Sequence, residues 1–265
     1  MSASYELIDT HAHLDMTRFE SDLDDVVGRA LESGVTRIVC MGIDLPSSRR
    51  AAQLTEQYSF LYTAIGIHPE EARHATKQDI EDLAVLANNR RVIAIGEIGL
   101  DFYRDYGPRE KQAEVFGWQL DLASRLNLPV TIHAREADRE LIALLDAWPG
   151  RSAVKPPGVI HCFNSSLENA QAYIDMGFYI SLGGYIGYPS AKSVREVITQ
   201  LPLEKLLLET DCPFLPPQSH RGERNEPAYL IETATELARL KNVSVAELAY
   251  VTTTNAKLVF GRLDD

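Results

Sequence analysis

The chain alternates short runs of apolar, often β-branched residues with longer stretches in which apolar residues recur at helical spacing. The short runs predict strands at residues 7–10, 37–41, 61–67, 92–95, 129–132, 158–160, 178–182 and 206–208. The longer stretches predict helices at about residues 21–33, 78–88, 109–125, 138–147, 167–176, 191–200 and 227–240, with a further helix that opens at Pro46 and Ser47. One or two more helices are expected over residues 244–260.

Strict alternation of strands and helices predicts a parallel sheet with crossover helices. Eight such units within 265 residues favour a closed (β/α)8 barrel, the TIM barrel of the α/β class. We therefore expect one catalytic domain over residues 1–265, with the helices at 244–260 packed on the barrel. An open, doubly wound sheet is the alternative architecture.

The composition is that of a soluble globular chain, with 45% hydrophobic and 24% charged residues. No apolar run approaches the roughly 20 residues of a membrane-spanning helix, and residues 1–14 lack the regions of a signal peptide. We therefore expect a cytoplasmic protein without a membrane partner, and we favour a monomer. The net charge of -12 means that the electrostatic field of the whole molecule repels a polyanion. An anionic substrate therefore has to be attracted by a local positive site.

Polar side chains follow most of the predicted strands, at the end where barrel enzymes build their active sites. In chain order they are Asp9, His11 and His13 after the first strand, His68 after the third, Glu97 and Asp101 after the fourth, His133 after the fifth, His161 after the sixth, and Glu209 and Asp211 after the eighth. Because residues i and i+2 of a strand share a face, His11 and His13 point the same way, as do Glu209 and Asp211.

If that face is the inner one, four imidazoles and two carboxylates converge on the barrel axis: His11, His13, Glu97, His133, His161 and Asp211. Burying such groups costs several kcal/mol unless something pairs them, and divalent cations do pair them. The set is too large for one tetrahedral ion with an open position, which favours two ions with Glu97 as the bridge. Asp9, Asp101 and Glu209 are expected as outer partners of these ligands, although a structural salt bridge is an equal alternative for Asp9 and Glu209.

Several ordered motifs resemble the signatures of the TatD family, over about residues 7–260. They are Asp9-Thr10-His11-Ala12-His13-Leu14-Asp15, Gly66-Ile67-His68-Pro69, Gly96-Glu97-Ile98-Gly99-Leu100-Asp101-Phe102, His161-Cys162-Phe163, Glu209-Thr210-Asp211-Cys212-Pro213 and Arg221-Gly222-Glu223-Arg224-Asn225-Glu226-Pro227. Two positions depart from the family pattern: Phe102 stands where many members carry Tyr, and Glu223 stands where Lys is common.

The resemblance implies a TIM barrel of the amidohydrolase-like group and a deoxyribonuclease or related phosphodiesterase activity, usually dependent on Mg2+. It also implies His11, His13 and Asp211 around one metal, His133 and His161 around the other, and Glu97 shared between them. Four histidines favour Zn2+ or Mn2+ over Mg2+ by ligand preference, so the identity of the metal stays open.

A centre with two divalent ions and two carboxylates is formally positive, so it can attract the negatively charged phosphodiester locally. We expect the ions to activate a water for attack on phosphorus, with Asp211 as general base. The expected substrate is DNA, or short ends of nucleic acid. Its contacts are expected from His68, Tyr103, Arg104, Arg135, Tyr185, Arg221, Arg224 and Asn225, with the two tyrosines stacking a terminal base.

Two other functions fit the same residues. A small-molecule amidohydrolase or lactonase has an almost identical metal centre, because fold and ligands do not determine the substrate. A protein that keeps metal only for folding is the second rival, but structural sites are usually closed by four ligands, whereas this one has room for water.

Overall fold

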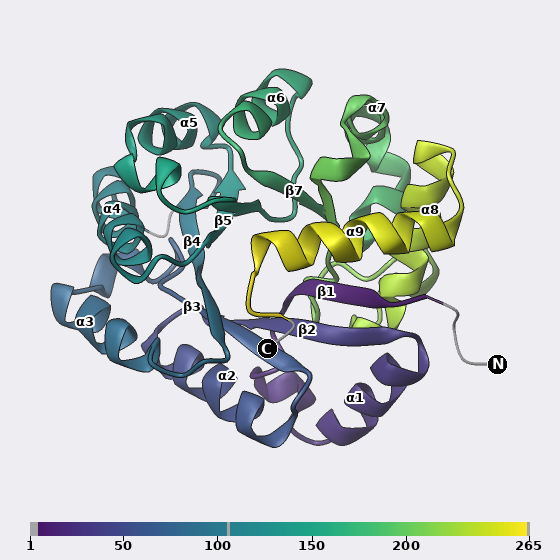
Figure 1. The fold of residues 1–265 in the computed structure, drawn as a ribbon, viewed down its shortest axis with the longest axis horizontal. Coiled ribbons are helices and arrows are strands. Elements are labelled where there is room, and N and C mark those ends of the chain that lie inside the picture. The colour runs from purple at the N-terminus through teal and green to yellow at the C-terminus, as the bar shows by residue number, and fades with distance from the viewer. Residues whose placement is uncertain (1–4, 105–106, 264–265) are drawn as a thin grey trace.

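The computed structural model describes residues 5–104 and 107–263 of the chain. The ends of the predicted domain, residues 1–4 and 264–265, lie outside the described residues. Eight parallel strands of the described chain form one sheet in sequence order (Figure 1). The strands are β1 (Leu7–Ala12), β2 (Val35–Met41), β3 (Leu61–Ile65), β4 (Val92–Asp101), β5 (Val130–Arg135), β6 (Gly158–Ile160), β7 (Tyr179–Leu182) and β8 (Leu206–Leu208).

The sheet closes on itself where the chain beyond β8 meets β1. Ala12 forms a parallel bridge with Cys212, and the backbone N–H of His13 donates to the carbonyl of Cys212 at 2.8 Å. The predicted barrel is thus confirmed and the open, doubly wound sheet is excluded. The longer helices surround it: α1 (Leu23–Glu32), α2 (Leu45–Gln57), α3 (Lys77–Leu86), α4 (Arg109–Leu126), α5 (Asp138–Ala147), α6 (Leu167–Asp175), α7 (Lys192–Gln200), α8 (Leu230–Lys241) and α9 (Val245–Val259).

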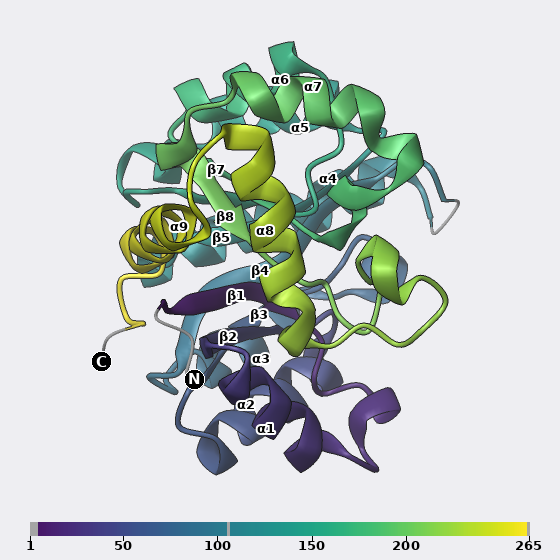
Figure 2. The ribbon, with the colours of Figure 1, turned by 90° about the vertical axis from the view of Figure 1, so that its right-hand side faces the viewer.

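The C-terminal segment closes the end of the barrel at which the strands begin. The segment predicted to hold one or two helices at residues 244–260 forms one helix, α9 (Val245–Val259), and its Ala256 and Val259 pack with Phe260 in one apolar cluster with Ile8 and Tyr179. Figure 2 shows α9 on one side of the strands and the long yellow-green segment before α8 on the other. Helix α9 therefore covers the end of the barrel at which the strands begin, and an active site can form at the opposite end.

Strand β4 is longer than the sequence pattern predicts. The prediction stops at residue 95, whereas the strand continues to Asp101, so Glu97 and Asp101 lie within it rather than beyond it. Gly99 makes the extension possible because its φ is +143° and a Cβ there would lie 2.0 Å from the carbonyl oxygen of His133. The absence of a side chain at Gly99 therefore lets β4 and β5 approach closely.

Local capping explains where several helices begin. The Asp44 side chain accepts from the backbone N–H of Ser47, and Pro46 stands in the first turn of α2. Thr76 and Asp79 form the corresponding capping box of α3. Every helix of the described residues is too short or too polar to cross a membrane.

Candidate metal centre

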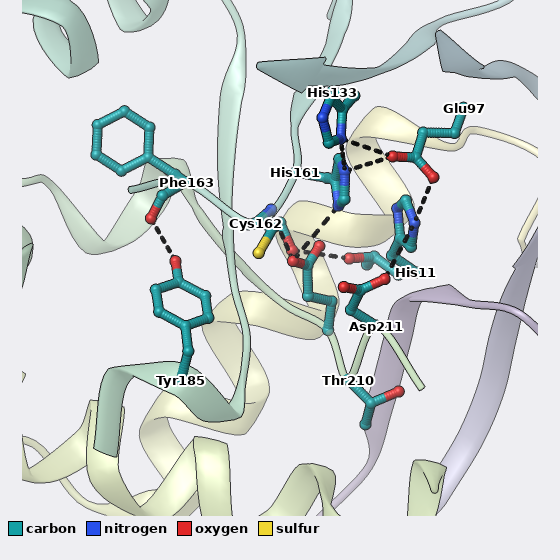
Figure 3. A network of polar contacts seen from close by, with 12 residues as sticks. His11, Glu97, His133, His161, Cys162, Phe163, Tyr185, Thr210 and Asp211 are labelled. Atoms are coloured by element: carbon teal, nitrogen blue, oxygen red, sulfur yellow. Dashed lines mark hydrogen bonds and ion pairs between the residues drawn. The ribbon is translucent and has the colours of Figure 1, made fainter. Parts of the chain in front are cut away.

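The predicted ligands come from elements that are far apart in the sequence. His11 lies on β1 and His13 directly after it, while Glu97 and His133 lie on β4 and β5. Asp211 and His161 follow β8 and β6. Figure 3 shows the Glu97 carboxylate between the imidazoles of His133 and His161 on one side and that of His11 on the other. The structure thus brings all six predicted side chains together at the open end of the barrel.

The first donor group consists of His11 Nε2, His13 Nε2, Asp211 Oδ1 and Glu97 Oε2. The two imidazole nitrogens lie 3.3 Å apart. Glu97 Oε2 lies 3.3 Å from His11 Nε2 and 3.6 Å from His13 Nε2. Asp211 Oδ1 lies 3.7 Å and 3.4 Å from the same two nitrogens. Both carboxylate oxygens therefore lie within 3.7 Å of the two imidazole nitrogens.

The second donor group consists of His133 Nδ1, His161 Nε2 and Glu97 Oε1. The carboxylate oxygen lies 3.0 Å from His133 Nδ1 and 2.8 Å from His161 Nε2, and the two nitrogens lie 3.3 Å apart. Glu97 thus offers one oxygen to each group, as expected of a bridging carboxylate.

These spacings fit divalent cations. Ligand bonds of about 2.0–2.2 Å in a tetrahedron place neighbouring donor atoms about 3.4 Å apart, and the spacings in the two groups range from 2.8 Å to 3.7 Å around that value. Most of the donor atoms are buried, and two pairs of imidazole nitrogens face each other at 3.3 Å. A cation satisfies these lone pairs together, so the residues of both groups fit the metal that the predicted chemistry needs.

The carboxylates and imidazoles of the centre perturb one another strongly. Burial raises the pKa of Glu97, but the surrounding imidazoles, His161 above all, outweigh burial and hold this pKa well below its usual range. Burial opposes protonation of His161, yet Glu97 and Glu209 outweigh it and raise its pKa. Asp211 is half-buried, and its hydrogen bond to His13 keeps its pKa low. Both carboxyl groups are therefore ionised and ready to bind cations at neutral pH.

The three predicted outer carboxylates differ in what they touch. Asp101 Oδ2 lies 3.2 Å from His133 Nε2, so the His133 ring presents Nδ1 to the centre. Glu209 Oε1 accepts from the backbone N–H of Cys162 at 2.7 Å and lies 3.7 Å from His161 Nδ1. Asp101 and Glu209 therefore stand behind His133 and His161, on the side away from the centre.

Asp9 has a different role. Its carboxylate accepts from the backbone N–H groups of His11 at 3.2 Å and Thr210 at 2.9 Å, and from the Thr210 hydroxyl at 2.6 Å. It does not touch the His11 ring, whose Nδ1 is buried without a partner in the described structure. Burial raises the pKa of Asp9 to about 7. Asp9 thus connects the end of β1 to the chain after β8 through these hydrogen bonds.

His68 stands beside the second donor group. Its Nδ1 accepts from the backbone N–H of Glu70 at 3.1 Å, which assigns the proton to Nε2. That Nε2 lies 3.5 Å from Glu97 Oε1, and burial lowers the pKa of His68 to about 3. His68 is therefore a neutral imidazole that aims an N–H donor at the centre.

Tyr103 and Arg135 form a pair at the mouth of the site. The Arg135 guanidinium lies 4.0 Å from the centroid of the Tyr103 ring. Asp101 Oδ1 accepts from the backbone N–H groups of Tyr103 and Arg104, both at 3.0 Å. The same carboxylate therefore orients His133 and positions the loop that carries Tyr103 and Arg104.

The structure places three predicted substrate contacts elsewhere. Tyr185 is only 7% exposed, and its hydroxyl donates to the carbonyl of Phe163, so its ring is part of the wall. Asn225 is fully buried and donates to the carbonyls of Thr210 and Phe214. These two predictions are corrected, because both side chains hold the chain in place rather than face a substrate.

Arg224 is the third of these residues. It is paired bidentately with Asp22 at 2.8 Å and 2.6 Å and donates to the carbonyl of Arg18 at 2.6 Å. Arg221, by contrast, is exposed and stacks over the Tyr188 ring at 4.1 Å. The sequence of a loop does not show which arginine has an acidic neighbour in space. The prediction that Arg224 contacts substrate is therefore corrected, because this side chain tethers the loop to Asp22.

One exposed aromatic residue beside the centre was missed. Phe214 is 40% exposed, and its ring centroid lies 5.9 Å from that of His13. The sequence signal was its position three residues after Asp211, in the motif that carries this ligand.

Comparison with known proteins agrees with this geometry. Residues 8–261 match the family model described as TatD related DNase. The chain is 43% identical, over 96% of its own length and 98% of the other, to the uncharacterized metal-dependent hydrolase YabD of Bacillus subtilis. It is 35% identical, over 96% of its length and 99% of the other, to the 3'-5' ssDNA/RNA exonuclease TatD of Shigella flexneri.

Solved structures give the same result. The crystal structure of YJJV, a TatD homologue from Escherichia coli, superposes with a TM-score of 0.90 at 34% identity and covers 96% of this chain and 98% of that one. A hydrolase of the TatD family from Entamoeba histolytica superposes with a TM-score of 0.88 at 25% identity, over 98% and 99% of the two chains. The chain therefore belongs to the TatD-related DNase family of metal-dependent hydrolases.

Proposed function

We propose that the protein is an exonuclease that uses two divalent cations to hydrolyse phosphodiester bonds at the ends of single-stranded DNA or RNA. The observation that carries the proposal is the position of Glu97, whose two oxygens each complete a separate group of donor atoms. The relative from Shigella flexneri, named as an exonuclease of single-stranded DNA and RNA, supports this substrate class.

The first donor group would hold one cation through His11, His13 and Asp211, and the second would hold the other through His133 and His161. Divalent ions at such a centre polarise the phosphoryl group and activate a water molecule for attack. The nitrogen-rich donor set favours Zn2+ or Mn2+ during purification, while the family resemblance favours Mg2+ as the activating ion.

The chain itself supplies the proton acceptor and the orientation. Asp211 is ionised at neutral pH because its bond to His13 outweighs the effect of burial, so its carboxylate can accept a proton from the attacking water. His68 aims a neutral N–H at the centre, which suits a non-bridging phosphate oxygen. Arg135, stacked on Tyr103, offers the charge that the acidic surface as a whole cannot provide.

The decisive test compares substrates on the same enzyme preparation. End-labelled single-stranded oligonucleotides, the matching duplex, and a panel of cyclic amides and lactones are each incubated with the protein and Mg2+ or Mn2+. We expect stepwise shortening of the single strand, slower attack on the duplex, and loss of turnover in Asp211→Asn. Hydrolysis of an amide or lactone without shortening of any oligonucleotide would replace the proposal with the small-molecule hydrolase.

A further inference from the structure

Large apolar side chains at the surface fall into two sets. In the described residues, the exposed ones are Leu31, Val85, Tyr103, Phe214, Tyr250 and Leu258. Four of them lie on the outer helices α1, α3 and α9, where scattered apolar side chains are common. The other two, Tyr103 and Phe214, are both aromatic, and both lie beside the metal centre.

The two rings adjoin opposite halves of the centre. Phe214 packs edge-on against His13 of the first donor group, with ring planes at 73°. Tyr103 follows Asp101, the carboxylate that holds His133 of the second donor group. Glu97 bridges the two groups, so a phosphate held at the centre would have one aromatic ring on each side.

Phe214 is held rigidly by its backbone although its ring is open to solvent. Its N–H donates to the carbonyl of Asp211 at 2.9 Å. Its own carbonyl accepts from Asn225 Nδ2 at 2.6 Å, and Asn225 is fully buried. The hydrogen bonds therefore present an apolar face at a fixed place next to a ligand, which costs less entropy on binding than a mobile side chain.

An arginine accompanies Phe214, as one accompanies Tyr103. The guanidinium of Arg18, from the loop after β1, lies 5.7 Å from the centroid of the Phe214 ring, while Arg135 lies 4.0 Å from that of Tyr103. Arg224, paired with Asp22, donates to the carbonyl of Arg18 and so tethers the segment that carries it. Each pair combines a ring that can stack on a base with a cation that can reach the neighbouring phosphate.

We propose that Phe214 and Arg18 form a nucleotide subsite on the side of the first donor group, opposite the Tyr103–Arg135 pair. The inference rests on the proposed nuclease function and adds a second base-binding platform to it. A nucleobase stacks on Phe214 while Arg18 binds the adjacent phosphate oxygen. Stacking on both sides requires bases that are not paired, so the platforms select single-stranded or frayed ends over duplex.

The test places an abasic residue at successive positions on either side of the cleaved bond of a short, labelled single strand. Stacking on an aromatic residue gives the intact substrate a kcat/KM about 5- to 100-fold higher than the abasic one. In Phe214→Leu, which keeps apolar bulk without an aromatic face, we expect this ratio to fall toward unity on one side of the bond, mainly through KM. In Tyr103→Leu we expect the same fall on the other side.

Two further variants serve as controls. Phe214→Tyr retains an aromatic face and is expected to keep the wild-type ratio, which separates stacking from a general defect in folding. Tyr250→Leu removes an exposed ring from α9, at the sealed end of the barrel, and is expected to keep both ratios. A wild-type ratio at every position in Phe214→Leu overturns the subsite and leaves the nuclease proposal standing, whereas a wild-type protein that cleaves no oligonucleotide overturns both.

Discussion

Glu97 Oε1 lies 2.8 Å from His161 Nε2, while the other oxygen of the same carboxylate lies 3.3 Å from His11 Nε2. The rings of His161 and His11 are stacked with centroids 3.9 Å apart, so one acidic group serves two parallel imidazoles. This relationship joins the two donor groups into one centre through a single carboxylate on β4.

Replacing Glu97 with Gln should abolish most of the activity while leaving the barrel folded. An amide offers one oxygen and one N–H2 group, so it cannot donate an oxygen to both groups. We expect kcat/KM on a single-stranded oligonucleotide to fall by more than about 100-fold, since loss of an outer partner of a ligand alone costs 10–100-fold. Near-wild-type turnover in Glu97→Gln with unchanged circular dichroism would argue against the bridge.

Asp101→Asn should weaken the second donor group selectively. The carboxylate orients His133 through Nε2 and also positions the loop with Tyr103. We expect a loss of about 10- to 100-fold in apparent metal affinity, measured as the concentration of Mn2+ that restores half of the activity. Excess Mn2+ should recover much of the rate. If the rate falls without any change in the Mn2+ requirement, Asp101 does not act through His133.

Asp9→Asn should affect stability more than metal binding. The three donors on Asp9 come from His11 and Thr210, and an asparagine amide would turn its own donors toward at least one of them. Leaving such a buried group unsatisfied costs about 1–3 kcal/mol, which urea denaturation of the metal-free protein would detect. Unchanged stability combined with lost metal affinity would instead assign Asp9 to the centre.

The barrel and its ligand positions could be predicted because they depend on features that are local in sequence. Each strand is a short apolar run, and a ligand often stands where that run stops, as with His161 directly after β6. Parity within a strand also placed His11 beside His13. The extension of β4 could not be predicted, since the apolar run ends at residue 95 and the close approach of Gly99 to His133 appears only in the structure.

The loop residues were harder to predict for a different reason. Arg224 and Arg221 look alike in the sequence, yet Arg224 forms an ion pair with Asp22, which lies 202 residues away in the chain. Asn225 and Tyr185 have polar groups that could serve a substrate, but backbone carbonyls from other segments use them. The hydrogen-bond partner of a loop side chain depends on how the loops pack against one another. The hydrophobic periodicity of the sequence contains no information about that packing.

His220 should make the loop before α8 more stable in mild acid. Its ring lies 2.9 Å from carboxylate oxygens of both Glu223 and Glu232 and stacks on Tyr229. The hydrogen bond to Glu223 and the charge of Glu232 raise the pKa of His220 above 6.5. The stabilisation is therefore complete below the ordinary pKa of the unfolded chain and is lost as the pH rises through the raised pKa.

The measurement is the free energy of unfolding of wild type and His220→Gln at pH 5.5 and pH 8.5. We expect wild type to be more stable by about 1 kcal/mol or less at the lower pH, as for other partly exposed ion pairs. The difference should shrink at the higher pH. A difference that is equal at both pH values would mean that the ring contributes through stacking on Tyr229 rather than through its charge.

The two donor groups joined by Glu97 are expected to hold a pair of divalent cations. To test this, the protein is stripped with a chelator, reloaded with Mn2+ and freed of unbound ion, and its metal content is measured by elemental analysis. We expect about two ions per chain in wild type, with activity that appears only after reloading. One ion per chain in the fully active protein would contradict it.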